Sequence, residues 1–174
     1  GTKNRSITYA AYPGERPVFS GGVRITGWKQ QAGGLWTAEL PEVKAGMWYF
    51  QQLFADGQRQ TRARTPNTGT FRTAGPLAPY AHNEQSRRDP KTKLGFEYRN
   101  EDLKPFVNQD DVQLVVYHSW TTSRHHLAAL DTARKTVRFT APCGWPIGWL
   151  ENQQRYYVDN VREGLDAPGA WYLD

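Results

Sequence analysis

The chain has 174 residues, of which 38% are hydrophobic, and its 22 Lys and Arg against 17 Asp and Glu give a formal net charge of +5. This length suits one domain or two small ones, and the seven Trp, nine Tyr and seven Phe can build a packed core, which excludes a disordered chain and a collagen. No run approaches the roughly 18 apolar residues of a membrane-spanning helix, and the single cysteine, Cys143, cannot form an internal disulfide.

The 16 Gly and 11 Pro are scattered along the chain, which favours many short strands joined by turns. Residues 6–12 alternate apolar and polar side chains up to Pro13-Gly14 and predict a strand. Two very short strands are expected at residues 18–20 and 23–25, separated by glycines. Short strands with glycine corners are typical of a coil of a parallel β-helix.

Residues 35–40 alternate and end at Pro41, which predicts another strand. Asp56-Gly57 lies between two β-capable runs and tolerates the positive φ angles of a type I′ turn, so a hairpin is expected. Residues 62–89 show little periodicity and predict a long surface loop with at most fragments of strand. Residues 100–103 favour one or two helical turns before Pro105.

Residues 112–117 are the most apolar run and predict a central strand with both faces covered. A loop over 119–124 precedes a second predicted hairpin, whose strands are 126–130 and 136–140. The chain then continues with an aromatic turn cluster, a strand at 155–160, a helical turn at 161–165 and a final strand that begins near Trp171.

Residues 11–18, Ala-Tyr-Pro-Gly-Glu-Arg-Pro-Val, followed by Ser-Gly-Gly at 20–22, resemble the first coil of secreted right-handed parallel β-helix proteins of the pectate-lyase-like superfamily. Val-Tyr-His-Ser-Trp-Thr-Thr-Ser-Arg-His at 116–125, together with residues 154–158 and 165–174, is similar to a bacterial branch of that superfamily. That branch includes glycoside hydrolase family 141, which acts on fucosylated pectin or xylan. In such proteins an inserted β-rich domain interrupts the first coil, and the chain re-enters the helix at a Trp-Tyr-Leu-Asp segment.

The resemblance implies an all-β fold, the start of a right-handed parallel β-helix interrupted by an inserted β-sandwich or barrel-like domain. Residues 1–27 would form the first β-helix strands, residues 28–152 the insert, and residues 153–174 the return to the β-helix. The remainder of the parent β-helix would then be a partner of this chain.

The same resemblance implies a secreted or periplasmic protein that degrades polysaccharides. In it, this part would shape the glycan cleft, while the catalytic acids lie elsewhere, so we carry over no catalytic residue. The expected partner is a polysaccharide or oligosaccharide, with a preference for acidic sugars, and we expect no cofactor, no membrane span and no nucleic acid. The alternative is a non-catalytic structural or carbohydrate-binding module.

Residues 118–126 bring together the side-chain types that a sugar site uses, and we predict that His118, Trp120, Arg124 and His125 contact substrate. An aromatic face stacks on the C–H side of a pyranose, while Arg and His donate to hydroxyls or to a uronate carboxylate. The alternative is that Trp120 and His118 pack in the core or at a corner, with Ser and Thr satisfying backbone groups.

Arg62 and Arg64 would lie on one face of a strand after the Asp-Gly turn, where they could grip an acidic glycan. The alternative is a solvated strand edge whose charge deters edge-to-edge pairing.

The sequence gives weaker signals for metal binding and for catalysis by paired carboxylates. His118, His125, His126 and Cys143 lack the paired short spacing of structural zinc sites, so we expect no metal. Asp110-Asp111 precedes a strand, where adjacent side chains point to opposite faces, so the pair favours a turn over a catalytic couple. Three tryptophans near Pro and Gly are more typical of corner packing than of binding platforms: Trp145, Trp149 and Trp171.

Overall fold

The computed structural model describes residues 1–79 and 81–174. The chain divides into two compact units, Gly1–Met47 and Trp48–Asp174, which we describe separately.

The first unit contains little regular structure. Strand β1 (Lys29–Gln30) pairs antiparallel with β2 (Trp36–Thr37). The 3-10 helix η1 (Ala32–Gly34) lies between these strands, and helix α1 (Pro41–Lys44) follows with a proline in its first turn. The strand predicted at 35–40 is therefore reduced to two residues.

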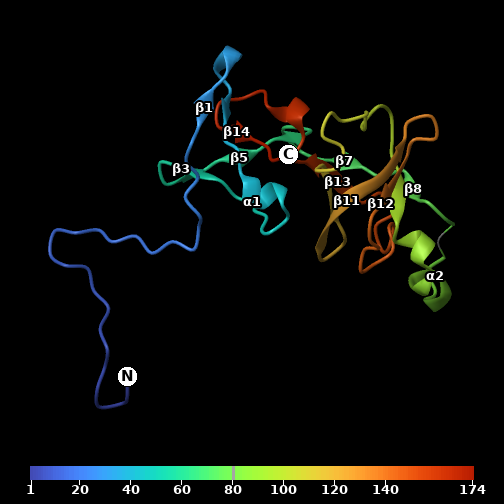
Figure 1. The fold of residues 1–174 in the computed structure, drawn as a ribbon. Helices are drawn as coiled ribbons and strands as arrows, with labels where there is room; N and C mark the ends of the chain where they lie inside the picture. Colours follow the sequence, from blue (N-terminus) through green and yellow to red (C-terminus); the bar gives the residue numbers. More distant parts are fainter. Residues whose placement is uncertain (80) are drawn as a thin grey trace. The chain divides into compact units, whose positions relative to one another are not determined.

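The strands predicted within residues 6–25 are not formed. The structure describes all of residues 1–27 and gives them only an isolated bridge between Thr2 and Arg5 (Figure 1). Tyr9 is 90% exposed and Phe19 is 92% exposed. A strand needs a neighbour for its backbone hydrogen bonds and a surface for its apolar side chains, and neither is present here. Alternation alone was therefore insufficient in this segment.

The second unit is built on an eight-stranded sheet with β10 (Gln113–Tyr117) inside it. Strand β10 pairs antiparallel with β11 (Thr122–Asp131) on one side and β13 (Arg155–Asp159) on the other. The prediction of a central strand is confirmed. The other strands follow the order β6-β13-β10-β11-β12-β9-β8, with β7 also on β13: β6 (Arg64–Thr65), β7 (Phe71–Arg72), β8 (Gly75–Pro76), β9 (Gly95–Glu97) and β12 (Thr136–Phe139).

Two strand pairs lie outside this sheet. Strands β3 (Phe54–Ala55) and β4 (Gln58–Arg59) form the predicted hairpin, with φ angles of 50° at Asp56 and 73° at Gly57. Strands β5 (Thr61–Arg62) and β14 (Ala170–Trp171) pair in parallel.

The helices of this unit are short. Helix α2 (Glu84–Arg88) was not predicted, and its Asn83 cap accepts a hydrogen bond from the Ser86 amide at 2.8 Å. The 3-10 helices η2 (Pro90–Thr92) and η3 (Arg162–Gly164) follow, the second at the predicted turn. The prediction of a helix at 100–103 was wrong, because Asn100 adopts a φ of 47° and the chain turns there. In the described part of the chain, no helix has the length and apolar character to cross a bilayer.

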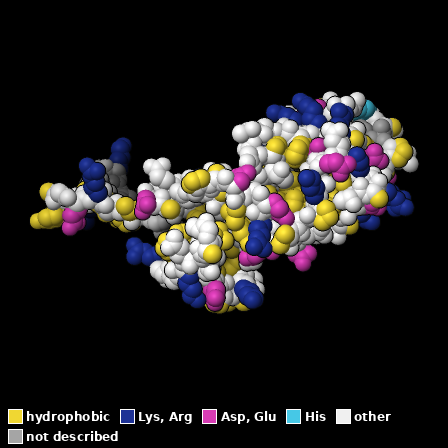
Figure 2. Space-filling view, turned by 90° about the horizontal axis from the view of Figure 1, so that it is seen from above, with side chains coloured by type: hydrophobic (Ala, Val, Ile, Leu, Met, Phe, Trp, Pro, Cys, Tyr) yellow, Lys and Arg dark blue, Asp and Glu magenta, His cyan; other side chains and the backbone are white. Residues whose placement is uncertain are grey.

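The described residues thus give an all-β fold with antiparallel sheets and few helices. They contain no coil of a parallel β-helix, and that part of the expected architecture stays a prediction, as do the boundaries at 27 and 152. The surface carries both signs of charge, with Lys and Arg interspersed among Asp and Glu on the visible face in Figure 2.

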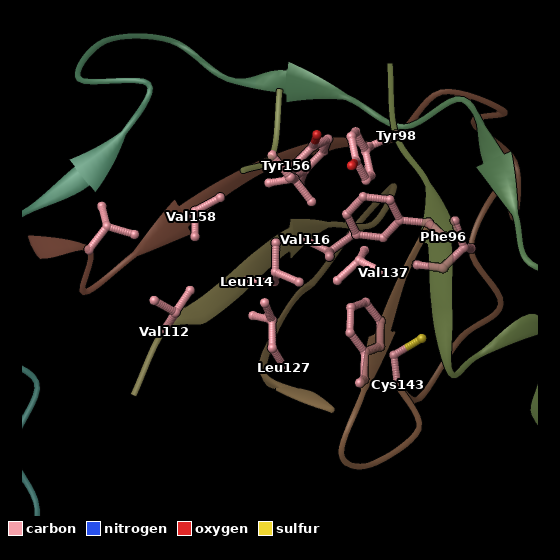
Figure 3. Close-up of a cluster of buried hydrophobic side chains, with 14 residues drawn as sticks. Phe96, Tyr98, Val112, Leu114, Val116, Leu127, Val137, Cys143, Tyr156 and Val158 are labelled. Carbon is pink, nitrogen blue, oxygen red and sulfur yellow. The ribbon is translucent and has the colours of Figure 1, made fainter. Parts of the chain in front are cut away.

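The hydrophobic core lies against one side of the eight-stranded sheet (Figure 3). Leu114 and Val116 alternate along β10, and Tyr156 and Val158 alternate along β13, so the four side chains share this side. The Tyr156 ring also packs against Phe96 from β9 with a centroid distance of 4.6 Å. Burial of these side chains supplies the main stabilisation of the sheet.

Gly95 provides a test of this packing. A Cβ atom at Gly95 would lie 2.0 Å from the Val137 carbonyl oxygen and 3.0 Å from the Arg138 Cα, both on the paired strand β12. We expect Gly95→Ala to lower the free energy of unfolding by about 3 kcal/mol, because β9 must move away from β12. Gly144→Ala is the control, since a Cβ there meets open space. Equal urea midpoints for the two variants would contradict this packing.

Candidate functional site

Alternation along the central strands divides the predicted site residues between the two sides of the sheet. Arg124 is paired with Val115, which is paired in turn with Tyr157. His125 is paired with Leu114, whose side chain lies in the core. Arg124 and His125 therefore point to opposite sides. We call the side with the core the core face, and the other side the polar face, which carries Gln113, Val115, Tyr117, Arg124, Arg155, Tyr157 and Asp159.

His118 and His125 are both buried on the core side. The His125 ring stacks on Phe139 at 4.2 Å with an interplanar angle of 7°. Burial, with a contribution from the nearby His118, lowers the pKa of His125 to about 4. His118 Nε2 lies 2.8 Å from Ser123 Oγ, and burial also lowers its pKa. Both imidazoles are neutral at pH 7, as the core requires.

On the polar face, one buried carboxylate serves two guanidinium groups. Asp159 accepts a hydrogen bond from Arg124 Nη1 and forms an ion pair with Arg62 Nη1 at 3.5 Å. Gln113 Oε1 accepts from the same two nitrogens, at 2.9 Å from Arg124 and 3.3 Å from Arg62. Two positive charges thus share one negative charge, and the cluster keeps a net positive charge.

Arg62 is the buried arginine of this cluster. Its Nε donates to Asn160 Oδ1 at 3.1 Å, and its Nη2 donates to the Tyr49 hydroxyl. Its guanidinium carbon also lies 5.4 Å from the Trp171 ring centroid. Arg62 is therefore a pairing and packing residue inside the fold, and the interpretation of a solvated strand edge does not apply to it.

Arg64 lies on the same face and is oriented by the backbone. Its Nε and Nη2 donate to the carbonyls of Pro66 and Gly69, at 3.0 and 2.6 Å. Its guanidinium carbon lies 3.9 Å from the Tyr157 ring centroid. The single strand expected after the Asp-Gly turn is not formed: Arg62 lies in β5, which pairs with β14, and Arg64 lies in β6, where it is paired with Asp159 of β13.

The stack continues across the sheet. The Tyr157 and Tyr117 rings lie 6.0 Å apart, and the Arg155 guanidinium carbon lies 5.3 Å from the Tyr117 centroid. We call Arg64, Tyr157, Tyr117 and Arg155 the arginine-tyrosine ladder. Among the described residues, neither arginine of the ladder has an ion-pair partner, and Arg155 is exposed.

Trp120 lies in the turn between β10 and β11, three residues after the ladder residue Tyr117. It is 54% exposed, and its ring packs edge-on against Trp145 at 4.9 Å. The six predicted residues are thus not one cluster: Arg62, Arg64 and Arg124 share the polar face, His118 and His125 share the core, and Trp120 occupies a turn.

Metal or thiol chemistry has little support in the described part of the chain. No group of three His, Cys, Asp or Glu side chains there could hold a metal ion. Burial raises the pKa of Cys143 to about 11, and its thiol donates to the Trp145 carbonyl at 2.8 Å.

Sequence reasoning missed the ladder tyrosines, Arg155 and the shared carboxylate Asp159. The signal was present in Arg-Tyr-Tyr-Val-Asp at 155–159, where every second residue is polar or aromatic and faces away from the core. If 155–159 had been aligned as a neighbour of the strand at 113–117, the outward residues of both strands would have defined the polar face.

Comparison with known proteins identifies a family that matches the chain and a solved structure with a similar fold. The sequence profile of the GH141 insertion domain matches residues 33–174. A solved structure described as a glycoside hydrolase is similar, with 24% identity, a TM-score of 0.58, and 89% of this chain aligned. The match covers 27% of that larger chain, and at this identity it shows a shared fold. The search of curated proteins gave no match.

The burial of His125 predicts a pH dependence of stability. Its pKa is about 4 in the folded chain against a usual value near 6.5, so the unfolded chain binds the proton first as the pH falls. As the pH falls from 7 to 5, protonation of His125 in the unfolded chain should lower the free energy of unfolding by about 2 kcal/mol. His125→Phe, which keeps a ring against Phe139, should remove this part of the slope, as measured by urea unfolding at each pH.

The matched control is Trp36→Phe, which changes an exposed ring and no titratable group. It should keep the wild-type slope. An unchanged slope in His125→Phe would contradict the burial of a neutral His125.

Proposed function

The chain belongs to the GH141 insertion domain family, and from this we propose that it is a glycan-contacting part of a longer carbohydrate-active β-helix protein. In that protein, a polysaccharide-degrading glycoside hydrolase, this part shapes the glycan cleft. We place residues 1–27 and 153–174 at the edge of the β-helix and residues 28–152 in the insert. We place the protein outside the cytoplasm, secreted or periplasmic.

The observation that carries this proposal is the arginine-tyrosine ladder. Arg64 and Arg155 stack on Tyr157 and Tyr117, and no carboxylate of the described residues neutralises them. The other arginines of this side have partners, Asp159 for Arg124 and Glu151 for Arg72. The ladder is therefore the local excess of positive charge that an acidic sugar needs.

The chemistry of the ladder fits a uronate. Guanidinium N–H groups donate to a carboxylate in a planar geometry, and the rings between them offer apolar faces to the sugar. The two backbone bonds of Arg64 fix its orientation, so little side-chain entropy is lost on binding. Arg124, held by Asp159 and Gln113, extends the same surface.

The buried residues favour a different role. His118, His125 and Arg62 are buried, with His125 stacked on Phe139 and Arg62 paired inside the fold. Their burial favours the alternative, a structural module, for these three positions. We therefore propose contact with the acidic sugar for Arg64 and Arg124, and sugar contact outside the ladder for Trp120. We propose a structural, supporting role for His118, His125 and Arg62.

We test the ladder with Arg64→Ala, Arg155→Ala and the double variant. The affinity of the chain for polygalacturonate, measured by electrophoresis in gels containing that polymer, should fall about tenfold in the double variant. Arg134→Ala is the charge-matched control, because Arg134 is an exposed arginine beside Asp131 in the turn between β11 and β12. An equal loss of affinity in Arg134→Ala would show that binding depends on net charge and not on the ladder. If the wild-type chain does not bind polygalacturonate, the acidic-glycan proposal is overturned.

The catalytic acids are tested separately. Asp110 and Asp111 lie in a turn before β10, as expected, and we assign them no catalytic role. We expect no release of reducing sugars from plant and algal glycans by the 174-residue chain, and release by the longer protein. Hydrolysis by the chain alone would place catalytic acids within it.

A further inference from the structure

Four aromatic rings form a row on three segments that are far apart in sequence. Trp120 lies 4.9 Å from Trp145, Trp145 lies 5.8 Å from Trp149, and Trp149 lies 5.8 Å from the His82 ring, as centroid distances. We call Trp120, Trp145, Trp149 and His82 the ring row. It lies on turns next to the sheet and includes no residue of the arginine-tyrosine ladder.

The turn that carries Trp145 and Trp149 is fixed by bonds to its surroundings. The Cys143 and Ile147 amides donate to the carbonyls of Lys93 and Thr92, at 3.0 and 2.9 Å. Ser119 Oγ, beside Trp120, donates to the Trp149 carbonyl at 3.2 Å. These bonds join the two turns, so the rings are positioned before any ligand arrives.

The row is open to solvent. Trp120 and His82 are exposed, and Trp145 and Trp149 are half-buried. Single exposed apolar residues need no explanation, but four neighbouring rings that all reach solvent on a fixed backbone offer a ligand a continuous aromatic surface.

A groove of about 430 Å³ adjoins the row at His82, which is one of its lining residues. Its polar side chains include Glu97 and Asn152, and its apolar walls come from residues 74–79. Among the described lining residues there is no Lys or Arg. A carboxylate ligand would therefore meet Glu97 with no cation to compensate it, whereas hydroxyls can donate to Glu97 and exchange hydrogen bonds with Asn152.

We propose that the ring row and this groove form a second carbohydrate site, which takes neutral sugars. Pyranose C–H faces lie against the tryptophan rings, and hydroxyl groups bind Glu97 and Asn152 in the groove. The proposal rests on the proposed function in assuming a glycan ligand, but it uses other residues and the opposite preference for charge.

The test uses the 174-residue chain in gels containing xyloglucan, arabinoxylan or galactomannan, with polygalacturonate alongside. We expect retardation by at least one neutral polymer, and Trp120→Ala should weaken it at least tenfold. Trp120→Phe, which keeps a ring, should retain most of the binding. Trp36→Ala is the matched control, because Trp36 is 56% exposed and lies outside the row.

The outcomes separate the two sites. Loss of neutral-polymer binding in Trp120→Ala, with polygalacturonate binding unchanged, supports the second site even if the ladder proposal fails. No retardation by any neutral polymer would overturn it and leave the row as a packing surface for the rest of the parent protein. Equal loss in Trp36→Ala would also overturn it, since binding would then follow tryptophan exposure in general.

Discussion

The second unit depends on the shared carboxylate of Asp159. It joins Arg62 from β5 to Arg124 from β11, and Gln113 on β10 accepts from both guanidinium groups. Arg62 is buried, and a buried cation without a partner is strongly destabilising. The position of Asp159 therefore determines where β5 lies against the sheet. Asp159 forms ion pairs with Arg62 and Arg124 but not with Arg64 or Arg155, so the ladder keeps its positive charge on the polar face.

Several strands of the second unit could be predicted from sequence, because they carry their own signals. The apolar run of β10 and the Asp-Gly turn before Gln58 each specify structure within a few residues. Residues 6–25 show the limit of such signals, because a strand also needs a partner that local sequence does not reveal. The turn at Asn100 shows a second limit, since a positive φ at one residue overrides a favourable capping pattern.

The sequence predicted which residue types the candidate site uses, but it did not predict which of them lie together. Strand β11 begins at Thr122 rather than at His126, so residues expected in a loop alternate along a strand instead. That shift in the strand start sends Arg124 to one side and His125 to the core. Asp159 could not be assigned as the partner of Arg62, because they are 97 positions apart in sequence and meet only in the folded chain.

The parallel pairing of β5 with β14 has a mechanical consequence. Thr61 is paired with Ala170 and Arg62 with Trp171, close to the C-terminal end of the chain. Tension applied to the chain on either side of these strands would slide them past each other. The bond from the Ala63 amide to the Trp171 carbonyl, at 2.7 Å, and the contact of Arg62 with the Trp171 ring would then have to break together. Such a shear arrangement resists pulling more strongly than strands that unzip one bond at a time.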